Sequence, residues 1–168
     1  AWQSFARFIA TLFLFLVGVS LTLSYSREVH QTGSDHLFRK YLLRGGKIFG
    51  LGLVITIATY LFVGSSYVVF GILHLIGFSI VAAYPFLKLD KWLTLAAGIV
   101  IILAGIYMDS LRSDSFWLIW LGVKQPGRSM VDYYPVFPYF GIVLIGVFAG
   151  RMLYPNGVRR FALPDLSQ

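Results

Sequence analysis

Five apolar stretches divide the chain, and each is close to the length that crosses a bilayer as a helix. A transmembrane helix needs about 20 predominantly apolar residues, and the polar positions gather between these stretches instead of alternating within them. We therefore predict an all-α, polytopic transmembrane helix bundle with about five spans. The predicted spans are residues 4–25, 42–63, 67–87, 92–108 and 136–153.

The connections predict how neighbouring spans pair. The links at 64–66 and 88–91 are very short, so the second, third and fourth spans should form antiparallel hairpins. The first stretch does not read as a signal peptide, because its apolar core is too long and no small-residue cleavage site follows it. No soluble domain or long repeat interrupts the chain, and we predict a single transmembrane domain over residues 1–168.

Composition supports a membrane protein. Hydrophobic residues make up 58% of the chain and charged residues 12%, whereas ordinary soluble domains carry about 25% charged residues. The lipid bilayer is therefore the expected partner, and the net charge of +7 reflects loop orientation rather than nucleic-acid binding. The chain has no cysteine, which excludes disulfides, a thiolate nucleophile and cysteine-based metal sites.

Lysine and arginine positions predict the orientation, because cytoplasmic loops of membrane proteins are enriched in both. Ten of the fourteen basic residues lie on one side, in the first loop and the adjoining start of the second span, the loop at 88–91 and the C-terminal region, and four lie on the other side. We expect an outside N-terminus, an inside C-terminus and a multi-pass protein of the cell membrane. The four residues of the outer side are Arg7, Arg112, Lys124 and Arg128.

His74 is the first candidate for chemistry, because it lies in the middle of the apolar sequence 71–77. Ionisable groups within membrane spans usually face a bundle interior or an aqueous path. A catalytic role and a purely structural one, with the imidazole hydrogen-bonded between helices, are both open. The other two histidines read as solvent-exposed residues of the first loop. No metal-ligand spacing occurs, so we expect no metal.

Asp132 is the second catalytic candidate. It lies on the outer side, just before Pro135 and Pro138, which suit the first turn of the last span because a missing N–H costs nothing there. Asp132 could cap that turn. Alternatively, it could orient the imidazole of His74 or balance its charge.

Arg44 and Lys47 are the candidate cofactor-binding residues. They are three apart on one side of the second span, near its cytoplasmic end. They could reach lipid headgroups, or they could bind the phosphates of a ligand that enters from the cytoplasm. Two Gly-x-x-x-Gly patterns, at 46–50 and 146–150, predict close helix packing.

The long outer loop, residues 109–134, contains a short apolar piece at 116–123 with two tryptophans. This piece is too short to span and too apolar to be free in water, so we predict an interfacial or re-entrant element. It could anchor the chain at the headgroups, or form a lid or wall over an outward-facing site.

Four ordered segments resemble the prokaryotic branch of the heparan-α-glucosaminide N-acetyltransferase-like family. The resemblance implies a membrane acyltransferase that uses cytoplasmic acetyl-CoA or another acyl-CoA as co-substrate and modifies a hydroxyl or amine acceptor across the membrane. It covers nearly the whole chain, including the tail at 161–167. The segments are FLFLVGVSLTLSYSR (13–27), YLLRGGKIFG (41–50), FGILHLIG (70–77) and VDYYPVFPYFG (131–141).

The chain departs from the family pattern at both ends. Members usually begin with a helix carrying Asp-x-x-Arg-Gly, followed by a histidine implicated in catalysis, and many continue into further hydrophobic helices. We therefore expect this chain to be incomplete at both ends. The family's main catalytic histidine has no counterpart here, so His74 does not take that role by motif.

The resulting hypothesis assigns the two sides of the membrane different roles. Arg44 and Lys47 hold CoA phosphates, the pantetheine arm follows glycines of the second, third and last spans, and the thioester meets the acceptor near His74 and Asp132. One alternative is a non-catalytic membrane subunit that packs against partner helices or copies of itself. A small-solute transporter is a further alternative, which no symmetry-related pair of interrupted helices supports.

Overall fold

A computed structural model describes residues 2–32, 36–63, 68, 70–111, 116–123 and 133–155, and these residues form helices and their connections. The described part of the chain is all-α, as predicted. Its six α-helices and one short 3₁₀-helix are α1 (Trp2–Thr32), α2 (Leu37–Val63), α3 (Ile72–Ala82), α4 (Tyr84–Lys88), α5 (Lys91–Ser110), η2 (Phe116–Leu121) and α6 (Val136–Leu153).

Four of these helices are long and apolar enough to cross a membrane: Ser4–Gln31, Leu37–Phe62, Lys91–Ser110 and Val136–Leu153. Their outer faces carry large exposed apolar side chains such as Leu51, Val54 and Leu61 on α2. A soluble monomer rarely exposes apolar patches this extensive, so lipid must cover them. The protein is therefore a multi-pass membrane protein in contact with the bilayer.

The prediction of one continuous helix over 67–87 is wrong. The backbone at Gly71 is extended, α3 covers 11 residues, and a turn at Ala83 separates it from the five-residue α4. Pro85 lies in the first turn of α4, and its missing N–H cannot continue the hydrogen-bond ladder of α3. At 1.5 Å per residue α3 rises only about 16 Å, against roughly 30 Å of hydrocarbon.

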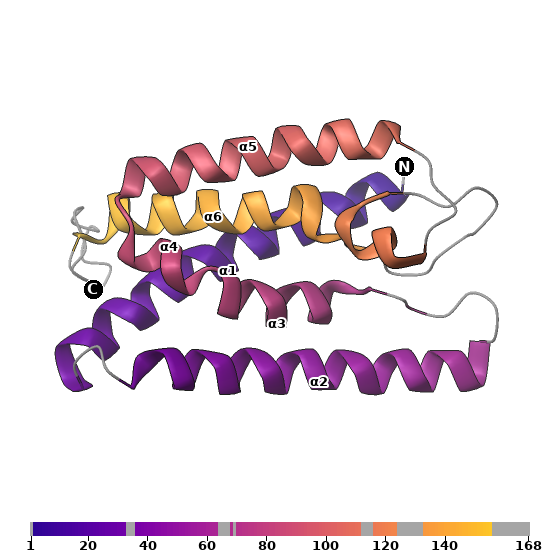
Figure 1. The fold of residues 1–168 in the computed structure, drawn as a ribbon, viewed down its shortest axis with the longest axis horizontal. Helices are drawn as coiled ribbons and strands as arrows, with labels where there is room; N and C mark the ends of the chain where they lie inside the picture. The colour runs from indigo at the N-terminus through magenta and orange to yellow at the C-terminus, as the bar shows by residue number, and fades with distance from the viewer. Residues whose placement is uncertain are drawn as a thin grey trace, which may run out of the picture.

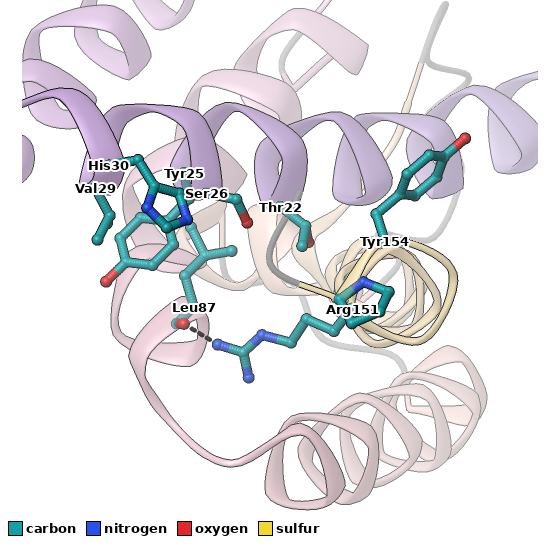
Figure 2. A pocket seen from close by; sticks show the side chains of 9 residues that line it. Thr22, Tyr25, Ser26, Val29, His30, Leu87, Arg151 and Tyr154 are labelled. Carbon is teal, nitrogen blue, oxygen red and sulfur yellow. Dashed lines mark hydrogen bonds between the residues drawn. The ribbon is translucent and has the colours of Figure 1, made fainter. Parts of the chain in front are cut away.

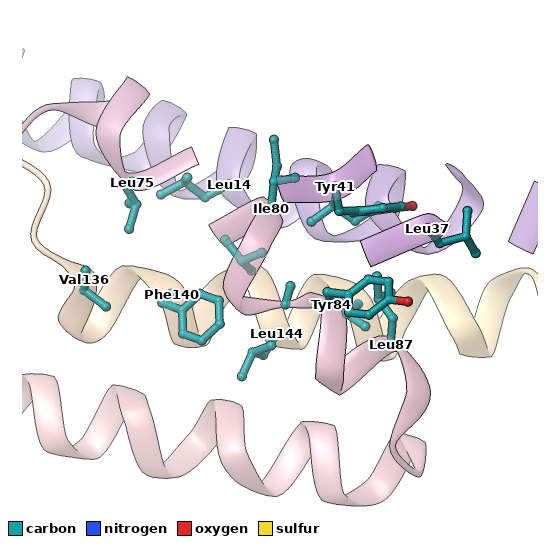
Figure 3. Packing of buried hydrophobic residues seen from close by; sticks show 14 of the residues in the cluster. Leu14, Leu37, Tyr41, Leu75, Ile80, Tyr84, Leu87, Val136, Phe140 and Leu144 are labelled. Carbon is teal, nitrogen blue, oxygen red and sulfur yellow. The ribbon is translucent and has the colours of Figure 1, made fainter. Parts of the chain in front are cut away.

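Two packed groups of helices meet at α3. In Figure 1, α5 runs beside α6, α1 crosses behind α6 at an angle, and α2 lies on the other side of α3. The most extensive contacts are those of α5 with α6, α1 with α6, and α2 with α3. Figure 3 shows the shared core, where Leu75 and Ile80 of α3 gather with Leu14 of α1 and with Phe140 and Leu144 of α6.

Glycines allow these helices to approach closely. A Cβ on Gly146 would lie 2.2 Å from the Phe15 carbonyl oxygen, and one on Gly150 would lie 3.0 Å from Thr22. Between α2 and α3, a Cβ on Gly77 would lie 2.7 Å from the Gly45 carbonyl oxygen. The packing role predicted for the pattern at 146–150 is therefore confirmed.

The same prediction is wrong for Gly46 and Gly50 within the described residues. No heavy atom lies within 4 Å of a Cβ placed on either glycine. The residues of α2 that pack on α3 include Gly45 and Gly52, and the helical period turns Gly46 and Gly50 toward the other side of α2. Their face of α2 is open.

The helix ends fall into two groups at opposite ends of the bundle (Figure 1). At one end α1 and α6 finish and α2 and α5 begin; we call this the basic end because its described residues include Arg39, Lys40, Arg44, Lys47 and Arg151. The other end, with the N-terminus, η2 and the last residues of α2 and α5, is the opposite end. Which end faces the cytoplasm stays a prediction from the basic residues.

Candidate functional site

His74 lies in the first turn of α3 with its ring pressed against α2. Its side chain is only 2% exposed. A Cβ on Gly52 would lie 2.9 Å from Nδ1, so only glycine leaves room for the ring at that position. Phe49 packs edge-on against the imidazole at 5.0 Å between ring centroids, and Phe70 lies at 5.5 Å.

The hydrogen bonds of His74 indicate its tautomer. The Gly71 N–H donates to Nδ1 at 3.4 Å, and Thr56 Oγ1 lies 3.5 Å from Nε2. Because Nδ1 accepts a proton donor, the neutral ring carries its own hydrogen on Nε2, facing Thr56. His74 thus caps α3 as the third-position residue of a capping box does. His74 does not line the three described cavities below, and its catalytic role stays a prediction.

Asp132 lies outside the described residues, so its predicted roles stay predictions. The two residues that follow it are held by hydrogen bonds to other parts of the bundle. The Tyr134 N–H donates to the Phe70 carbonyl at 3.0 Å, and the Tyr133 hydroxyl donates to the Ile119 carbonyl at 2.5 Å. The chain just before α6 therefore contacts both η2 and the residue that stacks on His74.

A cavity of about 260 Å³ opens among these elements at the opposite end. We call it the opposite-end cavity. Its polar side chains come from α1, α5, the segment before α6, and α6 itself: Arg7, Asp109, Tyr133 and Tyr139. Burial raises the pKa of Tyr133, and the negative charge of Asp109 adds to the effect. The Tyr133 hydroxyl therefore stays protonated and remains a hydrogen-bond donor.

The segment predicted at 116–123 forms part of the wall of this cavity. Its 3₁₀-helix is followed by Gly122, which lines the cavity. Gly122 has a φ of 126°, a conformation that side chains disfavour. Ile119 and Val123 are buried while Trp120 is 40% exposed, so this piece packs on the bundle. The segment forms a short helix of six residues, and its interfacial or re-entrant placement stays a prediction.

The cationic residues of α2 lie at the basic end. Lys40, Arg44 and Lys47 are spaced i, i+4 and i+7, which places them on one side of the helix. Lys40 Nζ pairs with Glu28 Oε1 at 2.9 Å, and Arg44 Nη1 lies 3.5 Å from Ser24 Oγ. Arg44 and Lys47 are both exposed. They lie seven and ten residues after Leu37, the first residue of α2, and are therefore beyond the first turn in which the helix dipole acts.

Arg44 borders a second cavity, which we call the lateral groove. It has a volume of about 310 Å³ and lies between α1, α2 and α3. Apart from Arg44 and Ser20 its lining is apolar: Phe13, Leu16, Val17, Leu21, Ile48, Ile76 and Ile80. Lys47 does not line it. Of the two predicted cations, Arg44 alone lines one of the three cavities formed by the described residues.

A third cavity, the basic-end cavity, has a volume of about 420 Å³ and lies on another side of α1 (Figure 2). Arg151 reaches from α6 and donates hydrogen bonds to the carbonyls of Leu87 and Leu89. Its guanidinium therefore satisfies carbonyls that α4 leaves open at its end. The ends of α1, α4 and α6 meet here (Figure 2), and their negative dipole ends disfavour a bound anion.

The sequence profile described as heparan-alpha-glucosaminide N-acetyltransferase, catalytic, matches residues 1–168. The chain belongs to this family. No curated protein and no solved structure matched it. The heparan-alpha-glucosaminide N-acetyltransferase family comprises N-acetyltransferases that use acetyl-CoA, so the resemblance recognised in the sequence is confirmed. Among the described residues, no group of three or more His, Asp and Glu could hold a metal ion.

Sequence reasoning missed several residues that line cavities, among them Asp109, Tyr139 and Arg151. Asp109 and Tyr139 are polar residues near the ends of apolar spans, where interfacial anchoring is the ordinary reading. The role of Arg151 could have been predicted from its position, because a cation in the last turn of a helix commonly bonds to free carbonyls. Its partners, however, are carbonyls at the C-terminal end of α4, an element that the sequence analysis did not separate from α3.

Proposed function

We propose that this protein is an integral membrane acyltransferase that moves an acetyl or acyl group from CoA at the basic end to an acceptor hydroxyl or amine at the opposite end. The basic end faces the cytoplasm, where acyl-CoA is available, and the membrane is the cell membrane. The observation that carries the proposal is the family match over the whole chain. Cavities at both ends of the bundle give the donor and the acceptor separate places to bind.

Arg44 and Lys47 bind the phosphates of the donor. Both cations are exposed on one side of α2, and among the described residues neither forms an ion pair, unlike Lys40, which pairs with Glu28. The basic-end cavity is the less suitable place for phosphates, because helix C-termini surround it and Arg151 already serves two carbonyls.

The opposite-end cavity binds the acceptor. Asp109 and the hydroxyls of Tyr133 and Tyr139 offer hydrogen-bond partners for a polyhydroxylated or amino compound. In the reaction the acceptor oxygen or nitrogen attacks the thioester carbonyl carbon, the carbon–sulfur bond breaks, and the thiolate leaves with the bonding electrons. The acceptor loses one proton to a base, and the thiolate takes one up to give free CoA.

His74 acts as that base through Nδ1, after this nitrogen has lost the Gly71 N–H, or as a polar guide for the acceptor, with Asp132 orienting it. The Phe70 carbonyl bonds to Tyr134, two residues after Asp132, and the Phe70 ring covers the imidazole. Since His74 is buried beneath Phe49 and Phe70, Phe70 has to move before the ring reaches a substrate. A shift of the segment before α6 would move both Phe70 and the residues around Asp132.

A transfer assay tests the proposal. The full-length protein is reconstituted in vesicles with D-glucosamine inside, which offers both amine and hydroxyl acceptors, and radiolabelled acetyl-CoA is added outside. We expect labelled N- or O-acetyl product inside and free CoA outside. Empty vesicles and vesicles with protein but no acetyl-CoA are the controls. Product formed only when both substrates are on one side contradicts transfer across the membrane.

A non-catalytic membrane subunit is the second candidate function. The open face at Gly46 and Gly50 favours it, because glycines elsewhere in the described helices pack against another element. Only 11% of the most apolar stretch of α2 is buried inside the bundle, whereas 44% of the corresponding stretch of α6 is buried. A second copy or a partner helix could pack there, and a folded assembly without acetyl transfer or CoA binding would support this alternative.

A further inference from the structure

The path that the sequence suggested for the pantetheine arm is closed. The glycines of α2 and α3 face each other at Gly45 and Gly77, and the ring of His74 fills the space at Gly52. Between α1 and α6, Gly146 and Gly150 contact Phe15 and Thr22. Helix backbones in contact leave no channel for a ligand between them.

The lateral groove offers the pantetheine arm another path, which is open. We infer that it holds the pantetheine arm and the acyl group of the donor, an inference that rests on the proposed acyltransferase function. Arg44 lies at the basic end of the groove and contacts the Ser24 hydroxyl. From the level of Ser24 to Phe13, the first residue of α1 that lines the groove, α1 rises about 16 Å. The groove therefore leads from the phosphate-binding cations into the middle of the span.

The chemistry of the groove matches the two parts of CoA. The charge of CoA is confined to its phosphates, and its arm and thioester are uncharged. Arg44 is the one charged side chain among the groove residues that the structure describes, and it lies at the end where the phosphates bind. The remaining lining is apolar except for the Ser20 hydroxyl, which can bond to an amide of the arm.

The arrangement of α1 and α2 allows such a ligand to enter. The two helices diverge from the basic end (Figure 1), and their direct contacts are few. They are tied together by polar pairs, Glu28 with Lys40 and Ser24 with Arg44. The groove is thus open along its side, and Ile76 and Ile80 of α3 form part of its wall.

The acyl end of the donor then approaches the opposite-end cavity along α1. Phe13 of the groove and Arg7 of that cavity are six residues apart on α1, which is about 9 Å of helix rise. The donor therefore has to cross only part of the membrane before its thioester approaches the acceptor.

Variants that fill the groove without changing charge test this inference. Ser20→Trp and Val17→Phe are introduced into the full-length protein, with Ser26→Trp, which faces the basic-end cavity, as the matched control. Two probes are compared by equilibrium binding: CoA, and adenosine 3′,5′-bisphosphate, which has phosphates but no arm. Thermal unfolding of each variant shows whether it is folded.

We expect both groove variants to weaken CoA binding by at least about tenfold while adenosine bisphosphate binding changes by less than about twofold. Ser26→Trp should bind both probes as the wild type does. Unchanged CoA binding in folded Ser20→Trp and Val17→Phe overturns the groove assignment but leaves the proposed function intact. If the wild-type protein binds neither probe, both proposals fail.

A photoreactive donor locates the acyl group independently of any substitution. A CoA thioester carrying a short diazirine acyl chain should crosslink to residues 13–21 of α1 or to α3. Crosslinks confined to α5 and α6 contradict the inference. A diazirine-bearing phospholipid that labels the groove and is not displaced by excess CoA assigns the groove to lipid, and also overturns it.

Discussion

The surroundings of His74 show how single residues determine the packing of the interior. The ring of His74 fits because Gly52 has no side chain, and its Nδ1 accepts the N–H of Gly71 at the start of α3. The sequence alone identified His74 as a buried polar residue. It could not show that the ring caps its own helix, because that contact depends on the extended backbone at Gly71.

Replacement of His74 by glutamine separates the two roles. His74→Gln keeps hydrogen-bonding capacity and removes the titratable ring. As a general base, His74 should contribute about 10²–10⁴-fold to the transfer rate, so we expect a loss of that size. Loss of one hydrogen bond of the ring should lower the free energy of unfolding by only about 0.5–1.5 kcal/mol. Both are measured on the complete protein.

Thr56→Val is the matched control, because it removes the partner of Nε2 and leaves the ring in place. We expect it to reduce stability slightly and to retain most of the activity. Near-normal turnover in His74→Gln, scaled to the amount of folded protein, would remove this residue from the chemistry and leave only its structural role.

At the level of helices, hydropathy predicted where the chain is apolar but not where helices break. Pro85 divides the predicted span at 67–87 because it cannot donate a backbone hydrogen bond. The proline is present in the sequence, but a count of apolar residues does not detect the helix break that it causes. The Gly-x-x-x-Gly pattern was equally ambiguous, since the copy at 146–150 is packed and the copy at 46–50 is open.

Two leucine substitutions test this difference between the glycines. Gly146→Leu would place its Cβ 2.2 Å from the Phe15 carbonyl oxygen, and we expect α1 and α6 to separate, at a cost of about 3 kcal/mol or more. Gly46→Leu meets no described atom within 4 Å and should leave thermal stability unchanged. Equal melting temperatures for Gly146→Leu and the wild type would contradict the described packing.

For the whole molecule, the sequence correctly predicted an all-α membrane bundle and its family. Composition and span length decide the class because the bilayer demands both. The cavities could not be predicted, since each is lined by residues far apart in the sequence, such as Arg7 with Asp109 and Tyr133. The orientation in the membrane still rests on the distribution of lysine and arginine.

Cysteine labelling tests that orientation, and the absence of native cysteines gives a clean background. Single cysteines replace Thr32, at the end of α1, and Ser113, in the outer loop. An impermeant maleimide applied to intact cells should label the cysteine at 113 and reach the cysteine at 32 only after the membrane is opened. Labelling of both positions from one side would contradict the predicted arrangement.

Binding of CoA by the complete protein tests the central claim most directly. We predict that replacing Arg44 and Lys47 together with glutamine weakens CoA binding strongly and leaves the bundle folded, while the exposed Arg27→Gln at the same end has little effect. Because both cations are exposed, added salt should weaken wild-type binding. Unchanged CoA binding by the folded double variant would contradict the account and leave both cations as headgroup contacts.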